Sequence, residues 1–172
     1  MTRRLPAAST LRAAFIAASI IWMILLIAAP FVASRAHAST LGTLFVVSVY
    51  GVGSVVCHQL AERSYHLWTA QMPVCARCAG IYFGAAGSAI GAAIYRTTSL
   101  ACRDGLNVAQ GSSLATRARL GLALAVTPTA LTLVYEWTTG QMPAHAIRAL
   151  AGVPIGAAAA WLVVTVADNQ VN

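Results

Sequence analysis

Four side chains that can bind a metal or exchange disulfides lie close together in this sequence. Cys57 and His58 are adjacent, and Cys75 and Cys78 form a C-x-x-C pair around Arg77. Two thiols spaced three residues apart lie on one face of a helix. Unpaired N–H groups in a first helical turn, together with the charge of Arg77, favour the thiolate form. Such a thiolate pair is suited to two chemistries, the binding of a soft metal and thiol–disulfide exchange.

The elements that position these groups are apolar segments. Hydrophobic residues make up 59% of the 172 residues and charged residues 9%, and the mean hydropathy is +0.73, a composition typical of membrane proteins. We predict an all-α fold, a polytopic integral membrane helical bundle of about five transmembrane helices that forms a single domain over residues 1–172. The partner is the lipid bilayer of a bacterial inner membrane, which the chain crosses several times. The expected spans are 13–33, 41–56, 79–95, 120–139 and 147–167, with Pro73 marking the start of the third helix.

The first apolar segment has a second interpretation. It follows three arginines and precedes Ala36-His37-Ala38, which a signal peptidase could cut, leaving four helices. Its apolar core is longer than that of a signal peptide, which favours a retained helix. The net charge of +7 comes entirely from arginine, as expected of loops that flank membrane spans. With five spans the arginines divide six against five, so the first helix decides the orientation: a cytoplasmic N-terminus and a cytoplasmic cysteine cluster.

Cys57 and His58 end the second apolar segment, about one hairpin away from the C-x-x-C pair. If the second and third helices pack antiparallel, these residues meet Cys75 and Cys78 at one membrane face. The result is a Cys₃His or Cys₂His set of the kind that zinc prefers, or a thiolate set that suits a soft monovalent metal such as Cu(I). Zinc would require the sulfurs to lie within about 4 Å of one another. Neighbouring helical residues do not share a face, so both compositions remain open.

Other polar residues fall into supporting positions. Gln59 and Tyr82 are predicted to hydrogen-bond to the cysteine cluster. Glu136 near the end of the fourth span and Arg148 at the start of the fifth are predicted to form an ion pair, with a carboxylate on a metal or proton path as the alternative. Solitary Cys102, and also His37 and His66, are interpreted as loop residues without a ligand role. Two GxxxG pairs, Gly80/Gly84 and Gly87/Gly91, predict close helix packing on several sides, within the chain or in a homo-oligomer.

Several of these residues together form a recognisable signature. The run Cys57-His58-Gln59, then Arg63-Ser64, then the segment 73–84 (PVCARCAGIYFG) resembles the membrane protein family called domain of unknown function 2085, with its pattern CHQ…RS…PVCxRCxGIYxG. The resemblance extends to Arg148, Gly152 and Gly156. Members of that family often carry Asp a few residues after the proline that matches Pro128, where this chain has Thr132. The resemblance implies a membrane protein and marks the same residues, but it implies no activity.

Three functions are compatible with these observations. The first is a membrane protein with a Cys/His metal site, the second is a thiol–disulfide oxidoreductase using Cys75 and Cys78, and the third is a helix-packing scaffold or assembly factor. The histidine beside Cys57 favours a metal over exchange chemistry. The sequence contains no phosphate-binding loop, Ser/His/Asp set or carboxylate pair, and no nucleic-acid-binding motif. It therefore assigns no catalytic residue.

Overall fold

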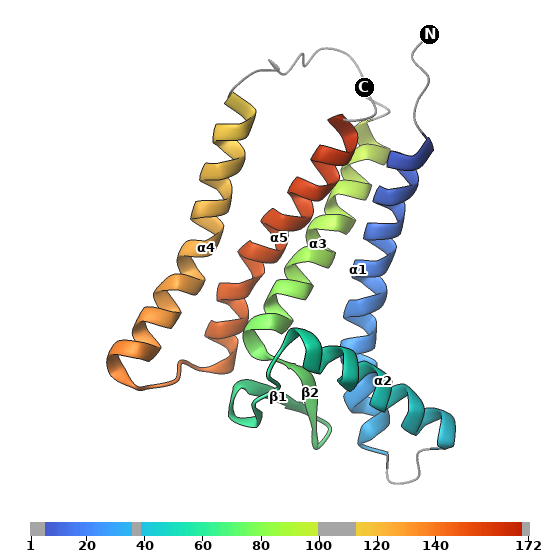
Figure 1. Cartoon of the computed structure of the whole chain (residues 1–172), viewed down its shortest axis with the longest axis vertical. Helices are drawn as coiled ribbons and strands as arrows, with labels where there is room; N and C mark the ends of the chain where they lie inside the picture. The colour runs from blue at the N-terminus through green and yellow to red at the C-terminus, as the bar shows by residue number, and fades with distance from the viewer. Residues whose placement is uncertain (1–5, 36–38, 100–112, 170–172) are drawn as a thin grey trace.

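The computed structural model describes residues 6–35, 39–99 and 113–169, which form five α-helices and a small β-hairpin (Figure 1). The elements in chain order are α1 (Pro6–Ala33), α2 (Thr40–Val56), the short 3₁₀ helix η1 (Ala61–Arg63), β1 (Ser64–Leu67), β2 (Ala70–Cys75), α3 (Ala76–Ser99), α4 (Ser113–Thr139) and α5 (His145–Asn169). Within this described part, three helices are long and apolar enough to cross a membrane: Thr10–Ala33, Arg119–Thr139 and His145–Val164. The predicted helical fold is therefore confirmed.

Helices α3 and α5 form the centre of the bundle and run parallel, both beginning at the lower end of the view in Figure 1. Their contact is built on glycines. A Cβ atom on Gly80 would meet the backbone oxygen of Ala149, and one on Gly156 would meet the backbone oxygen of Ile81. Glycine is thus required for two helix backbones to approach this closely. A Cβ on Gly87 would have no atom within 4 Å, and the same holds for Gly91, so the second GxxxG pair takes no part in this packing.

Helix α1 runs antiparallel to α3. Trp22 makes an edge-to-face ring contact with Tyr82 at 5.9 Å, and Leu26, one turn later, packs in the same buried cluster as Ala79. Leu26 is fully buried, so α1 packs into the core of the described structure.

Helix α2 does not extend along the bundle but lies obliquely across its lower end (Figure 1). Its start follows the end of α1, where Phe31 contacts Trp68 of the hairpin with ring centroids 5.3 Å apart. Its end leads into Cys57, which packs against the base of β2 and α3. A helix of 17 residues is about 25 Å long, which is shorter than the roughly 30 Å hydrocarbon core of a bilayer. Both ends of α2 thus lie at the hairpin end of the bundle. A helix that crossed the membrane would instead have one end at each membrane face.

Two local expectations were wrong. The segment expected to be a polar loop before the third helix forms η1 and the antiparallel pair β1–β2, with an irregularity between Ser64 and His66. Pro73 lies within β2 and α3 begins only at Ala76; proline is tolerated at such irregular positions of short strands. Helices α3 and α4 also extend into the predicted loop 96–119. Ala36, His37, Ala38 and Cys102 lie outside the described residues.

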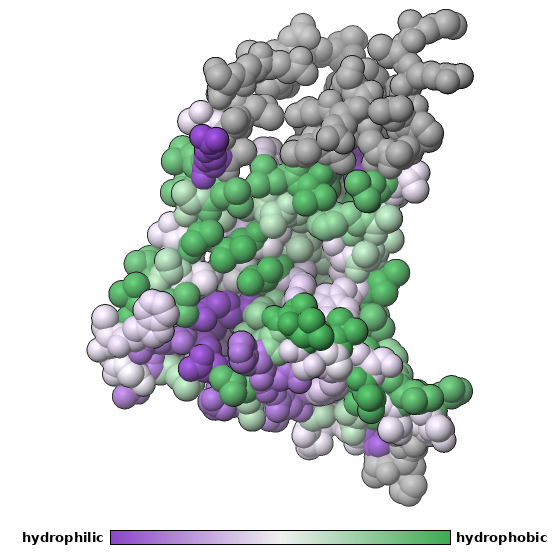
Figure 2. Space-filling model, in the orientation of Figure 1, coloured by the Kyte–Doolittle hydropathy of each residue, from purple (hydrophilic) through white to green (hydrophobic). Residues whose placement is uncertain are grey.

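The surface is apolar around the helices and polar at the hairpin end (Figure 2). Large side chains such as Ile21, Leu124 and Leu131 are more than half exposed. Extensive exposed apolar surface of this kind is expected where helices contact lipid.

Candidate metal centre

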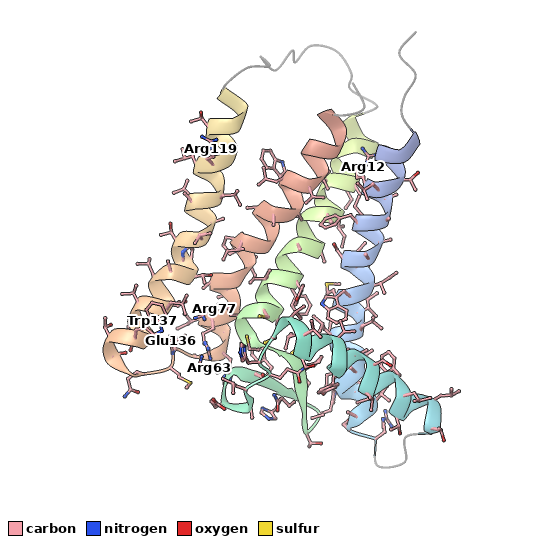
Figure 3. All side chains as sticks on the ribbon, viewed as in Figure 1. Arg12, Arg63, Arg77, Arg119, Glu136 and Trp137 are labelled. Atoms are coloured by element: carbon pink, nitrogen blue, oxygen red, sulfur yellow. The ribbon has the colours of Figure 1, made fainter. Side chains whose placement is uncertain are left out.

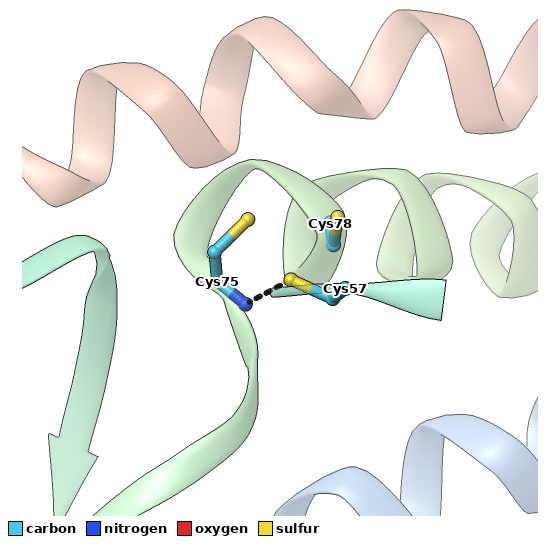
Figure 4. A group of neighbouring side chains, drawn as sticks. All are labelled: Cys57, Cys75 and Cys78. Atoms are coloured by element: carbon cyan, nitrogen blue, oxygen red, sulfur yellow. Dashed lines mark hydrogen bonds between the residues drawn. The ribbon is translucent and has the colours of Figure 1, made fainter. Parts of the chain in front are cut away.

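The three cysteines Cys57, Cys75 and Cys78 converge at the hairpin end of the bundle (Figure 4). Their sulfur atoms all lie within 4.8 Å of one another. Cys57 is buried and the other two are partly buried. Sulfurs in a tetrahedral zinc site are about 3.8 Å apart, as a Zn–S bond of about 2.3 Å requires. The bound of 4.8 Å on the sulfur separations is somewhat larger than the predicted value of about 4 Å.

Cys57 reaches this position because the chain leaves α2 in an extended conformation. Its backbone N–H donates to the carbonyl of Gly53 at 2.9 Å, which ends the helix. The backbone N–H of Cys75 then donates to the Cys57 sulfur at 3.2 Å (Figure 4). Hydrogen bonds of this kind stabilise sulfur as an anionic ligand.

Gln59 connects the turn after Cys57 to the hairpin through hydrogen bonds. Its side-chain Nε2 donates to the carbonyl of Tyr50 at 2.8 Å and to that of Pro73 at 2.7 Å. The backbone of Gln59 has a φ of 50°, a conformation that non-glycine residues rarely adopt, and Gln71 donates to its carbonyl at 2.6 Å. Gln59 was predicted to bond to the cysteine cluster, but these contacts go to backbone carbonyls. It acts by positioning Cys57.

Cys75 is the last residue of β2 and lies directly before the first turn of α3. Hydrogen bonding from the Cys78 thiol, supported by Cys57 and by the backbone N–H groups of Cys78 and Arg77, lowers the pKa of Cys75 to about 5, although burial acts to raise it. The lowered pKa favours the thiolate form of Cys75, and a thiolate is the form that binds metals and attacks disulfides.

Two further predicted residues flank the triad. His58 is exposed and does not belong to the group of three ligand atoms, because the extended chain directs neighbouring side chains to opposite sides. Tyr82 is partly buried and packs against the cluster that contains Cys57. The site is thus a triad of sulfurs in the described residues, and a tetrahedral metal such as zinc would keep one coordination position free for another ligand.

Glu136 on α4 contacts arginines on α3 and α5, on the side of the first α3 turn that faces away from the cysteine triad. Its Oε1 accepts a hydrogen bond from Arg77 Nη2 at 2.8 Å and forms an ion pair with Arg148 Nε at 3.1 Å. Arg77 Nη2 also donates to Thr132 Oγ1 at 3.1 Å. The structure thus contains the expected contact between Glu136 and Arg148. The sequence did not predict the role of Arg77. Its side chain points to Glu136 on α4 rather than to the cysteines. Its backbone N–H, rather than its charge, acts on Cys75. The spacing of Thr132 and Glu136, four residues apart on α4, was the available signal.

Comparison with known proteins identifies the family. Residues 57–162, more than half of the chain, match the family described as "Predicted membrane protein (DUF2085)". The chain belongs to this family. An uncharacterized protein of Methanocaldococcus jannaschii, MJ1492, is 39% identical over 56 residues, which is 33% of this chain and 36% of that protein. The match therefore spans about a third of the relative's length. No solved structure matches.

The DUF2085 match begins at Cys57 and ends within α5. It contains the cysteine triad, the hairpin, the glycine contact between α3 and α5, and the Glu136 network. Helix α1 and helix α2 precede it. The part of the chain that matches the family therefore includes the hairpin, α3, α4 and most of α5. The chain is a membrane protein of this family with helices able to span a membrane.

Proposed function

We propose that this DUF2085 protein binds one metal ion through Cys57, Cys75 and Cys78. The observation that supports the proposal is the approach of three sulfurs to within 4.8 Å of one another. These sulfurs come from separate elements, the end of α2, the end of β2 and the first turn of α3. The hydrogen bond from the Cys75 N–H to Cys57 and the clamp by Gln59 hold them together.

The donor set indicates the class of metal. Three thiolates suit zinc or Cu(I). Zinc with three protein ligands retains an open position, which is the arrangement of catalytic rather than structural zinc sites. A trigonal Cu(I) site would need no fourth ligand. We favour zinc, with the open position held by water or by an external ligand.

Elemental analysis of the purified full-length protein tests this proposal. We expect about one metal ion per chain, lost in Cys57→Ser, Cys75→Ser and Cys78→Ser. Cys102→Ser is the matched control, because it also removes one thiol, and it should keep the metal. His58→Ala should keep it as well. Metal that persists in all three triad variants, or that is absent from protein purified without chelators, would refute the site.

Thiol–disulfide exchange is the second candidate, favoured by the thiolate character of Cys75 beside Cys78. In this case metal-free protein would form a Cys75–Cys78 disulfide that a quinone or a thioredoxin-like partner reduces and re-forms. Mass spectrometry of alkylated protein separates the candidates. A disulfide that turns over, in protein that never contains metal, supports exchange and contradicts the metal site.

We further propose a bacterial inner-membrane protein in which α1, α3, α4 and α5 cross the bilayer while α2 stays at one face. This topology changes the arginine count. Seven arginines belong in sequence to the end that lacks the hairpin: Arg3, Arg4, Arg12, Arg96, Arg103, Arg117 and Arg119. Four belong to the hairpin end, and two of these, Arg77 and Arg148, are paired with Glu136. Because arginine is enriched in cytoplasmic loops, the metal centre would face away from the cytoplasm, contrary to the orientation expected for five spans.

Labelling of single added cysteines in intact spheroplasts tests the orientation. Gln141→Cys lies in the exposed α4–α5 connection, and Thr116→Cys lies in an exposed position near the start of α4. A membrane-impermeant maleimide should label the first and not the second, relative to unmodified protein. The reverse pattern would place the metal centre on the cytoplasmic side.

A further inference from the structure

The Glu136 network contains more positive than negative charge. Arg77 and Arg148 both contact the same oxygen of one carboxylate, Oε1 of Glu136. The side chain of Arg148 is 2% exposed and that of Glu136 is 9% exposed. One carboxylate neutralises one guanidinium, so among the residues that the structure describes one positive charge in a largely buried setting has no counter-charge. Burial of an uncompensated charge costs several kcal/mol, and a bound anion would remove this cost.

Hydrogen-bond donors in the same region also have no acceptor. The Nε atoms of Arg63, Arg77 and Arg148 are buried and make no hydrogen bond within the part of the chain that the structure describes. The same is true of Nε2 of His145. Arg148 Nε contacts Glu136 only as an ion pair and not with hydrogen-bond geometry. A buried donor without an acceptor is unfavourable, and three such guanidinium nitrogens beside an unpartnered imidazole nitrogen indicate a missing ligand with several acceptor oxygens.

These donors gather at the hairpin end, between α4 and the hairpin. Figure 3 shows Arg63, Arg77 and Glu136 grouped there. Tyr65, two residues after Arg63, contacts the ring of His145 at 5.5 Å, which brings the hairpin to the first turn of α5. Helix α4 lies beside α5, which separates it from α3 in the view of Figure 1, and strongly polar residues reach the surface at the hairpin end (Figure 2). The side chain of Arg77 is 14% exposed, so the arginine cluster is largely buried and also reaches the surface.

The helix ends add to the positive potential. Both α3 and α5 begin beside the cluster, with Arg77 and Arg148 in their first turns. The N-terminus of a helix carries a partial positive charge and favours anions. Guanidinium groups present several N–H donors in a planar fork that fits phosphate and carboxylate oxygens. A tetrahedral phosphate can accept from more than one fork at once.

We propose that Arg63, Arg77 and Arg148 form a binding site for a phosphate group. The phosphate belongs either to the headgroup of an anionic phospholipid or to a soluble phosphate-bearing molecule. Basic clusters between membrane helices are suited to lipid headgroups, and strongly polar residues reach the surface at this end of the bundle (Figure 2). The site is independent of the proposed metal centre, because none of its donors is a cysteine.

Thermal unfolding of the full-length protein in a neutral detergent tests the proposal in two arms. In the first arm, inorganic phosphate is titrated against potassium chloride at matched ionic strength. In the second arm, phosphatidylglycerol is added in mixed micelles, with phosphatidylcholine as the control. We expect saturable stabilisation by one of the two ligands, since a ligand that binds only the folded state raises the unfolding temperature. A response to phosphate identifies a soluble ligand, and a response to phosphatidylglycerol alone identifies a lipid. No saturable response in either arm overturns the proposal.

Variants locate the site. Arg63→Gln leaves the contacts of Glu136 intact, and it should weaken binding by about tenfold or more, as the loss of a charge-assisted hydrogen bond implies. Arg35→Gln is the matched control, because Arg35 lies at the same end of the molecule, is exposed and lies over the ring of Phe31. Equal weakening in both variants would show unspecific attraction and overturn the site.

A third variant does not remove any arginine. Thr132→Asp places a carboxylate beside Arg77, which Thr132 now contacts through its hydroxyl. The new charge should stabilise the protein without ligand and abolish the response to phosphate or lipid. An undiminished response in this variant would contradict the proposal. Cys75→Ser should leave the response unchanged, which separates this site from the metal centre.

Discussion

Replacement of Gly84 by alanine should destabilise the protein, whereas replacement of Gly87 by alanine should stabilise it. Both glycines lie in the interior of α3, three residues apart. A Cβ atom on Gly84 would meet the backbone oxygen of Val153 in α5, and a backbone atom can yield only if the helices move apart. A Cβ on Gly87 would have nothing within 4 Å. The two substitutions therefore make the same chemical change in opposite environments.

The magnitudes follow from two known effects. Alanine is favoured over glycine inside a helix by about 1 kcal/mol, so Gly87→Ala should raise the unfolding temperature by about 2–4 °C for a chain of this size. Gly84→Ala gains the same helical preference but adds a methyl group to a closed backbone contact. Such overpacking costs about 1–3 kcal/mol. The two variants should therefore differ by about 2–12 °C.

Thermal unfolding in detergent, followed by tryptophan fluorescence, measures this difference. The contact that Gly84 makes lies two turns from the first turn of α3, which carries Arg77 and Cys78. Separation of α3 from α5 should therefore also lower the metal content of Gly84→Ala. Equal unfolding temperatures for the two variants would refute the inference that α3 and α5 are in backbone contact at Gly84.

Three other variants or conditions test the hairpin end. Gln59→Ala should lose about 1–3 kcal/mol, because two partly buried carbonyls lose their donor, and it should retain less metal in elemental analysis. Glu136→Gln should cost about 3–5 kcal/mol; combination with Arg148→Gln should cost less than the sum, as a double-mutant cycle of unfolding measurements would show. In metal-free protein, alkylation of Cys75 by iodoacetamide should be half-maximal near pH 5, not near the usual value of about 8.5. Because this pKa is lowered on folding, its contribution to stability is complete above about pH 8.5 and is lost as the pH falls through about 5.

The sequence was sufficient to predict the features that depend on composition and on short spacing. Long apolar runs predicted α1, α4 and α5, since length and hydropathy define a candidate span directly. The C-x-x-C pair and the cysteine at the end of the preceding segment predicted the triad. The contact between Glu136 and Arg148 followed from two charges near the ends of consecutive helices, where an unpaired charge is costly.

The features that depend on how helices and strands pack against one another in three dimensions could not be predicted in the same way. The apolar run 41–56 has the composition of a short span, and its oblique position results from contacts made elsewhere, such as the bonds of Gln59 to Tyr50 and Pro73. Short strands like β1 and β2 carry little signal, since a few mixed residues fit a loop equally well. The position of Arg77 followed from the parallel packing of α3 on α5, which glycine patterns permit but do not specify.

The first turn of α3 connects the two proposed sites and explains why they share one end of the bundle. Cys78 and Arg77 are neighbours on this turn, so their side chains leave the helix in different directions, Cys78 toward Cys57 and Arg77 toward Glu136. Both directions are fixed only if the axis of α3 is fixed, and the backbone contact of Gly80 with Ala149 holds that axis on α5. The positive end of the helix favours thiolates on one side and an anion on the other. A single glycine-built helix pair can thus position the proposed metal ligand and the proposed anion ligand without any loop between them.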